Sequence, residues 1–168
     1  MLEMVRGATL VAATLTNGLL AGVFYAFAVS VMLGLRQVDN RTFVGAMQQI
    51  NVAIENGWFL ASFLGAPVLA ALATVLHLSA GHRHALPWIA AGFVLAAAAL
   101  IITVAVNVPL NNALDAAGGP DQIADLAAVR ASFEAAWVRW NVARAVTSTA
   151  AFGCFIWALV LYGRTSAA

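Results

Sequence analysis

Charged side chains are scarce in this chain of 168 residues, and lysine is absent. Asp, Glu, Lys and Arg make up 9% of the residues, and all eight basic residues are arginines. A soluble domain carries about 25% charged residues, whereas 63% of this chain is hydrophobic. The net charge of +1 offers no basic surface for a nucleic acid, so we predict no nucleic-acid partner. The scarcity of charge excludes an ordinary soluble domain and predicts an integral membrane protein.

Cysteine is almost as rare, because Cys154 is the single one. This excludes an intrachain disulfide and a metal site built from several cysteines. His77, His82 and His84 lie close together in sequence, and imidazoles can bind copper or zinc. No carboxylate or cysteine lies beside them, so we predict a solvated turn here rather than a metal site.

Four apolar runs are each long enough to cross a bilayer, which takes about 20 helical residues. They cover approximately residues 8–35, 58–79, 87–107 and 143–162. The first run is longer than the apolar part of a signal peptide, so we expect it to be retained. The prediction is a single all-α domain over 1–168, an integral membrane four-helix bundle that crosses the cell membrane several times, with the lipid bilayer around it.

The first and third connections are expected to hold additional helical segments. An amphipathic pattern begins after Asp39 and ends at Asn56, and its polar stripe could either face water or form a wall of a site. In the third connection, Pro109 predicts that the third span stops or bends near Val108. Asp121 is the expected cap of the next helix, which leads directly into the fourth apolar run.

Polar residues gather on one side of the predicted membrane, because two spans separate the first connection from the third. A stripe at helical steps of three or four comprises Arg130, Phe133, Trp137, Trp140 and Arg144, with Asn141 beside it. The other polar residues on this side are Gln48, Asn51, Glu55, Asn107, Asn111 and Asn112. Such a face suits a polar cavity, or a membrane boundary where Trp and Arg are both stable.

A second pattern favours a different class of function. Gly18, Gly22, Ala26 and Ser30 recur every four residues in the first span, and small residues at this spacing let another helix approach closely. The alternative interpretation is therefore a non-catalytic membrane protein that binds or assembles with a partner, or a homo-oligomer.

Four segments, in this order along nearly the whole chain, resemble the anthrone oxygenase-like family of small integral membrane proteins. They are GVFYAF at 22–27, FVGAMQQIN at 43–51, NVPLN at 107–111 and RxxFxxxWxxWNxxR at 130–144. The resemblance implies oxidation of anthrones to anthraquinones by molecular oxygen without a cofactor. An anthrone loses a proton from the carbon opposite its carbonyl, and the resulting aromatic enolate can itself reduce oxygen.

The resemblance implies a flat, lipophilic aromatic small molecule as ligand and assigns roles to the polar cluster. The site would need a base, donors for the enolate oxygen and an aromatic slot. The catalytic candidates are Arg144, Arg130, Asn141 and Glu55, with Glu55 as the first candidate for the base and Glu134 as the second. The substrate-binding candidates are Tyr25, Gln48, Asn51, Asn107, Asn111, Trp137 and Trp140.

Each assignment also has a structural alternative. Arg144 could extend to lipid headgroups, and Trp137 and Trp140 could be interfacial anchors. The asparagines could cap helix ends. Tyr25 could pack between helices, and Glu55 could be merely solvated.

Overall fold

The computed structural model describes residues 1–79 and 83–166, and the regular secondary structure of this part is all helical. In chain order the helices are α1 (Leu2–Ala26), η1 (Phe27–Val31), α2 (Met32–Leu35), α3 (Asn40–Ile54), α4 (Gly57–Leu76), α5 (Leu86–Ile102), η3 (Thr103–Asn107), α6 (Val108–Ala116) and α7 (Leu126–Ser166). The described residues form no strand. The expected all-α class is therefore confirmed.

Within the described part, four helical stretches are long and apolar enough to cross a membrane: Leu2–Leu35, Gly57–Leu76, Leu86–Ala116 and Leu126–Arg164. Many large apolar side chains point outward from them, among them Leu15, Leu19, Val68, Val94 and Val146. A water-soluble bundle would bury such side chains, whereas lipid is a good solvent for them. The chain is a multi-pass membrane protein.

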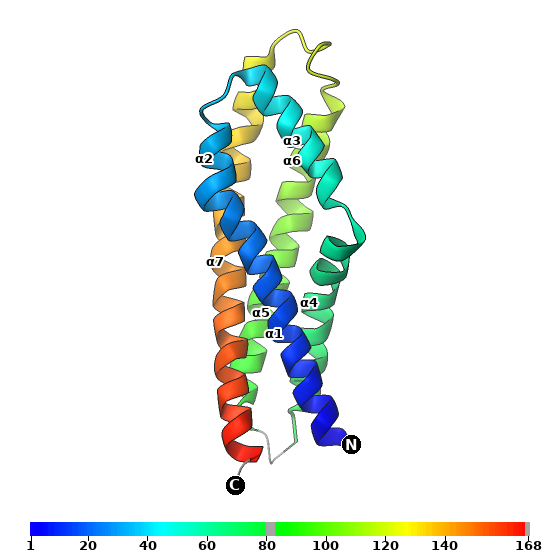
Figure 1. The fold of residues 1–168 in the computed structure, drawn as a ribbon, viewed down its shortest axis with the longest axis vertical. Helices are drawn as coiled ribbons and strands as arrows, with labels where there is room; N and C mark the ends of the chain where they lie inside the picture. The colour runs from blue at the N-terminus through cyan, green and yellow to red at the C-terminus, as the bar shows by residue number, and fades with distance from the viewer. Residues whose placement is uncertain (80–82, 167–168) are drawn as a thin grey trace.

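The four long stretches form an elongated bundle (Figure 1). α1 packs against α7 and α4, and α5 packs against the same two helices. The start of α1 and the end of α7 lie at one end of the bundle, and α3 crosses the other end. The first and third connections therefore share one end, where α3 packs on α6 and α7.

α3 is bound tightly into this end of the bundle. The Asp39 side chain accepts a hydrogen bond from the Thr42 backbone N–H (3.0 Å) and so caps the helix. The hydrogen bonds from the Thr42 hydroxyl and backbone hold the pKa of Asp39 below its usual range, so the cap weakens when acid protonates it. Phe43, Val44 and Met47 are buried in a cluster with α6 and α7 residues.

α7 begins differently from our expectation. The Asp125 carboxylate accepts a hydrogen bond from the Ala128 backbone N–H (2.9 Å), so Asp125 caps the helix. Asp121 instead forms an ion pair with Arg41 of α3. Sequence alone favoured Asp121 because it directly follows the flexible Gly-Gly-Pro turn.

Two turns of π-helix interrupt the first and third long stretches. In η1 the Met32 N–H bonds to the Phe27 carbonyl, and in η3 the Val108 N–H bonds to the Thr103 carbonyl. Of the two outcomes expected near Val108, a stop or a bend, the stop is wrong, because the Val108 backbone is helical and the stretch continues into α6. Pro109 has no N–H and would crowd an ordinary preceding turn, and the wider π-turn accommodates it. Such turns are frequent at functional sites.

Close approach of α5 and α7 depends on Gly92. A Cβ atom at this position would lie 2.7 Å from Phe155 Cζ and 2.9 Å from both Cε atoms. Phe155 is fully buried and cannot swing away. Gly18 of α1 similarly faces the Phe152 ring, whereas nothing lies within 4 Å of a Cβ at Gly22. The bundle itself thus uses the first glycine of the small-residue face.

We expect Gly92→Ala to destabilise the bundle by about 1–3 kcal/mol through overpacking, although alanine favours helix. Gly153→Ala in α7 is the matched control, because nothing lies within 4 Å of its Cβ. Thermal unfolding in detergent measures both. An equal shift in the two variants would contradict the proposed contact, and adding Phe155→Leu should restore part of the loss in Gly92→Ala.

Candidate functional site

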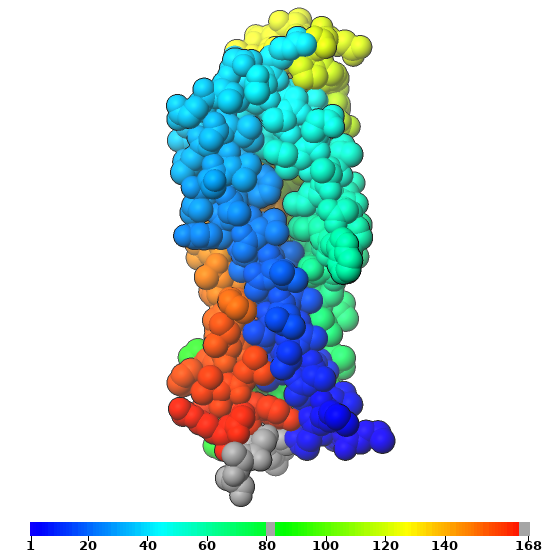
Figure 2. Space-filling view, viewed as in Figure 1, coloured from blue at the N-terminus to red at the C-terminus, as the bar shows by residue number. Residues whose placement is uncertain are grey.

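A cavity of about 220 Å³ lies in the half of the bundle nearer α3. One wall comes from α1 and η1, another from α3 and α4, and the back from η3, α6 and α7. Figure 2 shows the outer side of the first two walls, where the α1–α2 and α3–α4 segments run side by side. The polar lining residues are Asn51, Glu55, Thr103, Asn107, Asn111, Asn141 and Arg144, and the aromatic ones are Phe24, Phe27, Phe59, Phe63 and Trp137.

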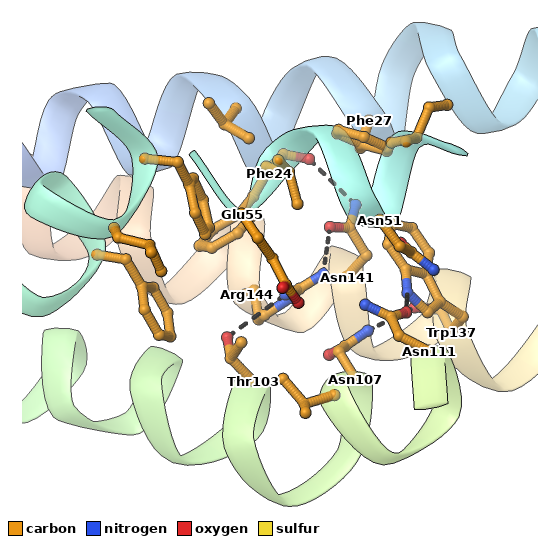
Figure 3. A pocket seen from close by; sticks show the side chains of 17 residues that line it. Phe24, Phe27, Asn51, Glu55, Thr103, Asn107, Asn111, Trp137, Asn141 and Arg144 are labelled. Atoms are coloured by element: carbon orange, nitrogen blue, oxygen red, sulfur yellow. Dashed lines mark hydrogen bonds between the residues drawn. The ribbon is translucent and has the colours of Figure 1, made fainter. Parts of the chain in front are cut away.

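Arg144 lies at the centre of this site, and its side chain points inward from α7 (Figure 3). The residue is 6% exposed. Its Nη2 donates to Asn141 Oδ1 (3.0 Å), and its Nη1 donates to Thr103 Oγ1 (3.4 Å). Among the described residues no carboxylate forms an ion pair with it. A buried arginine without an anionic partner is rare in a membrane helix and marks a candidate site.

Aromatic rings surround this guanidinium. Its central carbon lies 4.5 Å from the centroid of the Phe24 ring and 5.4 Å from that of Trp137. Trp137 in turn packs against Phe27 and Phe133, with ring centroids 5.6 Å and 6.0 Å away. Cation–π contacts of this kind stabilise a cation where water is excluded.

Asn141 connects α7 to the first π-turn. Its Nδ2 donates to the Phe24 carbonyl (3.1 Å), which lies one turn before η1. Its Oδ1 is the acceptor for Arg144, so the amide is bonded on both sides. Asn141 therefore fixes the position of Arg144 against α1.

Asn107 and Asn111 connect η3 and α6 to α7. Trp137 Nε1 donates to Asn111 Oδ1 (2.8 Å), and Asn107 Nδ2 donates to the Trp137 carbonyl (3.4 Å). Asn107 is fully buried, and no group of the described chain bonds to its Oδ1. The same holds for Nε of Arg144. The cavity thus holds one buried donor and one buried acceptor that the described residues leave unbonded.

Glu55 supplies the carboxylate of the cavity, from the junction of α3 and α4. Asn51, Glu55 and Asn111 also line a second, polar cavity of about 220 Å³ between α3 and α6. Asn112 and Asp115 belong to this second cavity and not to the first. Glu55 thus stands where the aromatic cavity meets a polar one.

The structure brings seven of the predicted site residues to this cavity: Asn51, Glu55, Asn107, Asn111, Trp137, Asn141 and Arg144. Gln48, Tyr25, Trp140 and Arg130 do not line it. Gln48 Nε2 donates to the Leu114 and Gly118 carbonyls, Tyr25 is 58% exposed on the outer surface, and Trp140 is half-buried.

Arg130 has a different role from Arg144, although the two share one stripe. Its Nη1 donates to the Val38 carbonyl (2.8 Å) and its Nη2 to the Arg36 carbonyl (3.1 Å). Its Nε bonds to Glu134 (2.7 Å), and the guanidinium lies 4.3 Å from the Phe43 ring centroid. Arg130 therefore stabilises the carboxyl-terminal end of α2, whose last carbonyls lack helical partners.

Sequence reasoning missed Thr103 and the phenylalanines of the cavity. Thr103 precedes Asn107 by one helical turn, and this spacing was an available signal. Phe24 and Phe27 lie on either side of Tyr25 in the 22–27 segment. The sequence analysis chose Tyr25, which has a polar hydroxyl, but the two phenylalanine rings line the cavity. Phe59 and Phe63 gave no signal within an apolar run.

Of the three histidines, His77 and His84 lie at the opposite end of the bundle from the cavity. His82 lies outside the described residues. His84 is exposed, whereas His77 is buried with its Nδ1 2.8 Å from the Ala73 carbonyl. Within the described residues, no group of three His, Cys, Asp or Glu side chains could hold a metal ion.

Comparison with known proteins gives one finding. The family model described as anthrone oxygenase matches residues 58–154. The match runs from the start of α4, through η3 and α6, to the part of α7 that holds Asn141 and Arg144. No curated protein and no solved structure matches the chain.

Proposed function

Because the chain belongs to the anthrone oxygenase family, we propose that it oxidises anthrone-like aromatic substrates with molecular oxygen, in the cell membrane and without a cofactor. The methylene carbon of the substrate loses two hydrogens and gains one oxygen atom as a carbonyl. The second oxygen atom leaves with these two hydrogens as water. The two electron pairs come from the substrate, so the balance needs no further reductant.

One observation carries this proposal: the buried guanidinium of Arg144 has no anionic partner among the described residues and faces an aromatic cavity. Removing the methylene proton places negative charge on the substrate oxygen. A fixed positive charge in a site with little water stabilises this enolate far more than water would. The neutral ketone gains less, so the interaction favours the charged state.

The rings around Arg144 provide the slot for a flat substrate. Phe59 and Phe63 stack on each other in α4 with their centroids 5.5 Å apart, and Trp137 faces the cavity from α7. Apolar contact of this kind binds a polycyclic ring and excludes water from the enolate.

Glu55 is the proposed base. Its carboxylate belongs both to the aromatic cavity, where the substrate would lose its proton, and to the polar cavity beside Asp115. A base in this position can accept a proton from the substrate and pass it to water on the other side.

Oxygen uptake by purified, chelator-treated protein given anthrone tests the proposal. We expect uptake well above the uncatalysed rate, one oxygen molecule consumed per anthraquinone formed, and no loss of rate after chelation. The control is the same protein after heat unfolding, in the same detergent. No uptake by protein that is shown to be folded would remove the oxygenase proposal.

A further inference from the structure

We propose that the cavity opens sideways into the bilayer, between the start of α4 and the η3–α6 segment, and that Leu60 and Val108 form the two sides of this lateral entrance. A lipophilic ligand then enters from one leaflet of the bilayer and not from water. The inference deepens the proposed function, on which it rests for the ring-binding role of the cavity. It adds an access route and the two residues that control the width of that route.

Leu60 and Val108 combine two properties that place them at the edge of the cavity. Both line it, and each is 40% exposed. Among the described residues around the cavity, they are the two large apolar side chains with the most exposed surface. A side chain that contacts the interior of a cavity and also the outside of the bundle stands at an opening between them.

Each of these two residues continues a row of side chains that face lipid. Leu64 follows Leu60 by about one helical turn and is 57% exposed, and Val104 precedes Val108 by about one turn and is also 57% exposed. Neither Leu64 nor Val104 is among the described residues that line the cavity. Leu60 and Val108 are therefore the points at which two lipid-facing rows reach the cavity.

The two rows lie on either side of the same opening. Leu60 and Pro67 share one face of α4, because seven residues make two helical turns. Pro67 borders a small cavity together with Ala96 and Leu100 of α5, so this face of α4 looks toward α5. The two helices run in opposite directions (Figure 1), and α5 continues through η3 into α6. Leu60, near the start of α4, therefore faces the segment that carries Val108.

The length of α4 gives the depth of this opening in the membrane. α4 is 20 residues long, which is roughly 30 Å of helix and matches the hydrocarbon core of a bilayer. Trp58 in its first turn is 88% exposed, as suits a tryptophan at the headgroup level. Leu60 lies just inside Trp58, so the lateral entrance faces the outer part of the acyl chains.

The other side of the cavity has the opposite character. Beyond Glu55 lies the polar cavity between α3 and α6, which includes Gln48, Asn112 and Asp115. A flat apolar ring is more stable among acyl chains than in water, so it accumulates at the lateral entrance and not beside these amides and carboxylates. The lateral entrance therefore suits the ligand, and the polar cavity suits water and protons.

The rates of binding test the lateral entrance without turnover. The probe is anthraquinone, and saturable quenching of tryptophan fluorescence, to which Trp137 in the cavity contributes, follows its arrival and departure in lipid nanodiscs. We expect Leu60→Phe to lower the association and dissociation rates together, each by about tenfold, because a larger side chain raises the barrier in both directions. Kd should stay within about threefold, whereas a side chain that only contacts the bound ring changes mainly the dissociation rate. Leu60→Ala should raise both rates.

Leu64→Phe and Val104→Phe are the matched controls, because they enlarge side chains of the same two rows away from the cavity. Neither should change a rate, whereas Val108→Phe should act like Leu60→Phe. A change confined to the dissociation rate in Leu60→Phe would overturn the entrance. Slowing of both rates by Asn112→Phe instead would place the route through the polar cavity and overturn it too.

A second measurement, on the unaltered protein, decides the route if these variants do not fold. Anthraquinone is attached by a flexible linker either to the acyl chain of a phosphatidylcholine or to dextran, which stays in water. We expect the lipid-attached ring to compete with free anthraquinone for the cavity, and the dextran-attached ring not to compete. Competition by the dextran-attached ring, or by neither, would overturn the inference.

The outcomes separate this inference from the proposed function. Oxygen uptake with anthrone, but binding rates that Leu60→Phe leaves unchanged, overturns the inference alone. Slowing of both rates in Leu60→Phe, without oxygen uptake by the parent protein, supports the inference and removes the oxygenase. Failure of anthraquinone to bind at all overturns the inference together with the ring-binding role of the cavity.

Discussion

Replacing Arg144 with methionine is expected to lower the oxygenation of an anthrone by about 10²- to 10³-fold, the usual effect of removing one group that stabilises an oxyanion. The loss should appear mainly in kcat, because the charge on the substrate oxygen develops during the reaction. Steady-state oxygen uptake measures it.

The same variant should still fold, with a free energy of unfolding within about 2 kcal/mol of the parent protein, because it removes a buried cation but leaves Asn141 Oδ1 without its donor. Arg144 is a buried cation that no carboxylate neutralises within the described part of the chain, and it leaves Nε unbonded. Methionine has a similar length and packs against aromatic rings such as Phe24 and Trp137. Replacing a poorly paired buried charge with an apolar side chain is often neutral or stabilising.

Arg139→Met is the matched control, because Arg139 lies on the exposed face of the same helix. It should change neither oxygen uptake nor the melting temperature appreciably. A large fall in the melting temperature of Arg144→Met, with activity lost in proportion to folded protein, would show that Arg144 serves structure. The variant Arg144→Lys should recover part of the activity, since it restores the charge but not the planar fork of donors.

The fold was predictable from the sequence because each long apolar run has one physical solution in a bilayer, a helix. The end of the third run was not predictable in the same way. Pro109 signals a disturbed turn, but whether the chain stops, bends or widens into a π-turn depends on what packs beside it. In the folded chain Asn107 bonds to the Trp137 carbonyl, and the helix continues.

The site was only partly predictable, for a reason that Arg130 and Arg144 illustrate. Both lie on the same stripe of α7 at helical spacing, so periodicity treats them alike. The Arg130 guanidinium donates hydrogen bonds to backbone carbonyls at the end of α2. The Arg144 guanidinium instead donates to Thr103 and lies among the aromatic rings. Their different roles come from tertiary neighbours, which no local pattern contains.

Trp140 and Asn141 show that the sequence also could not tell which of two adjacent residues faces the site. The two are adjacent, but a step of 100° around a helix separates them. Asn141 faces inward and is 1% exposed, whereas Trp140 is half-buried and outside the cavity. Only the packed bundle determines which of the two faces the site.

Replacing Glu55 with glutamine is expected to lower kcat by about 10²- to 10⁴-fold, the usual contribution of a general base, with a smaller change in KM. Glutamine keeps the shape of the side chain but cannot accept the substrate proton. If Glu55 is the base, its loss makes proton removal the slow step. An anthrone that carries deuterium on its methylene carbon should then show a larger isotope effect on kcat in the variant than in the parent protein.

The isotope effect distinguishes a base from a residue that only shapes the cavity. Asp115→Asn is the matched control, because Asp115 lines the neighbouring polar cavity but not the aromatic one. It should leave the isotope effect unchanged, even if proton escape slows slightly. Equal losses in the two variants, with no change in the isotope effect, would mean that the carboxylates act through the shape or charge of the polar cavity. Proton removal would then belong to water or hydroxide, and Arg144 would carry the catalysis by stabilising the enolate alone.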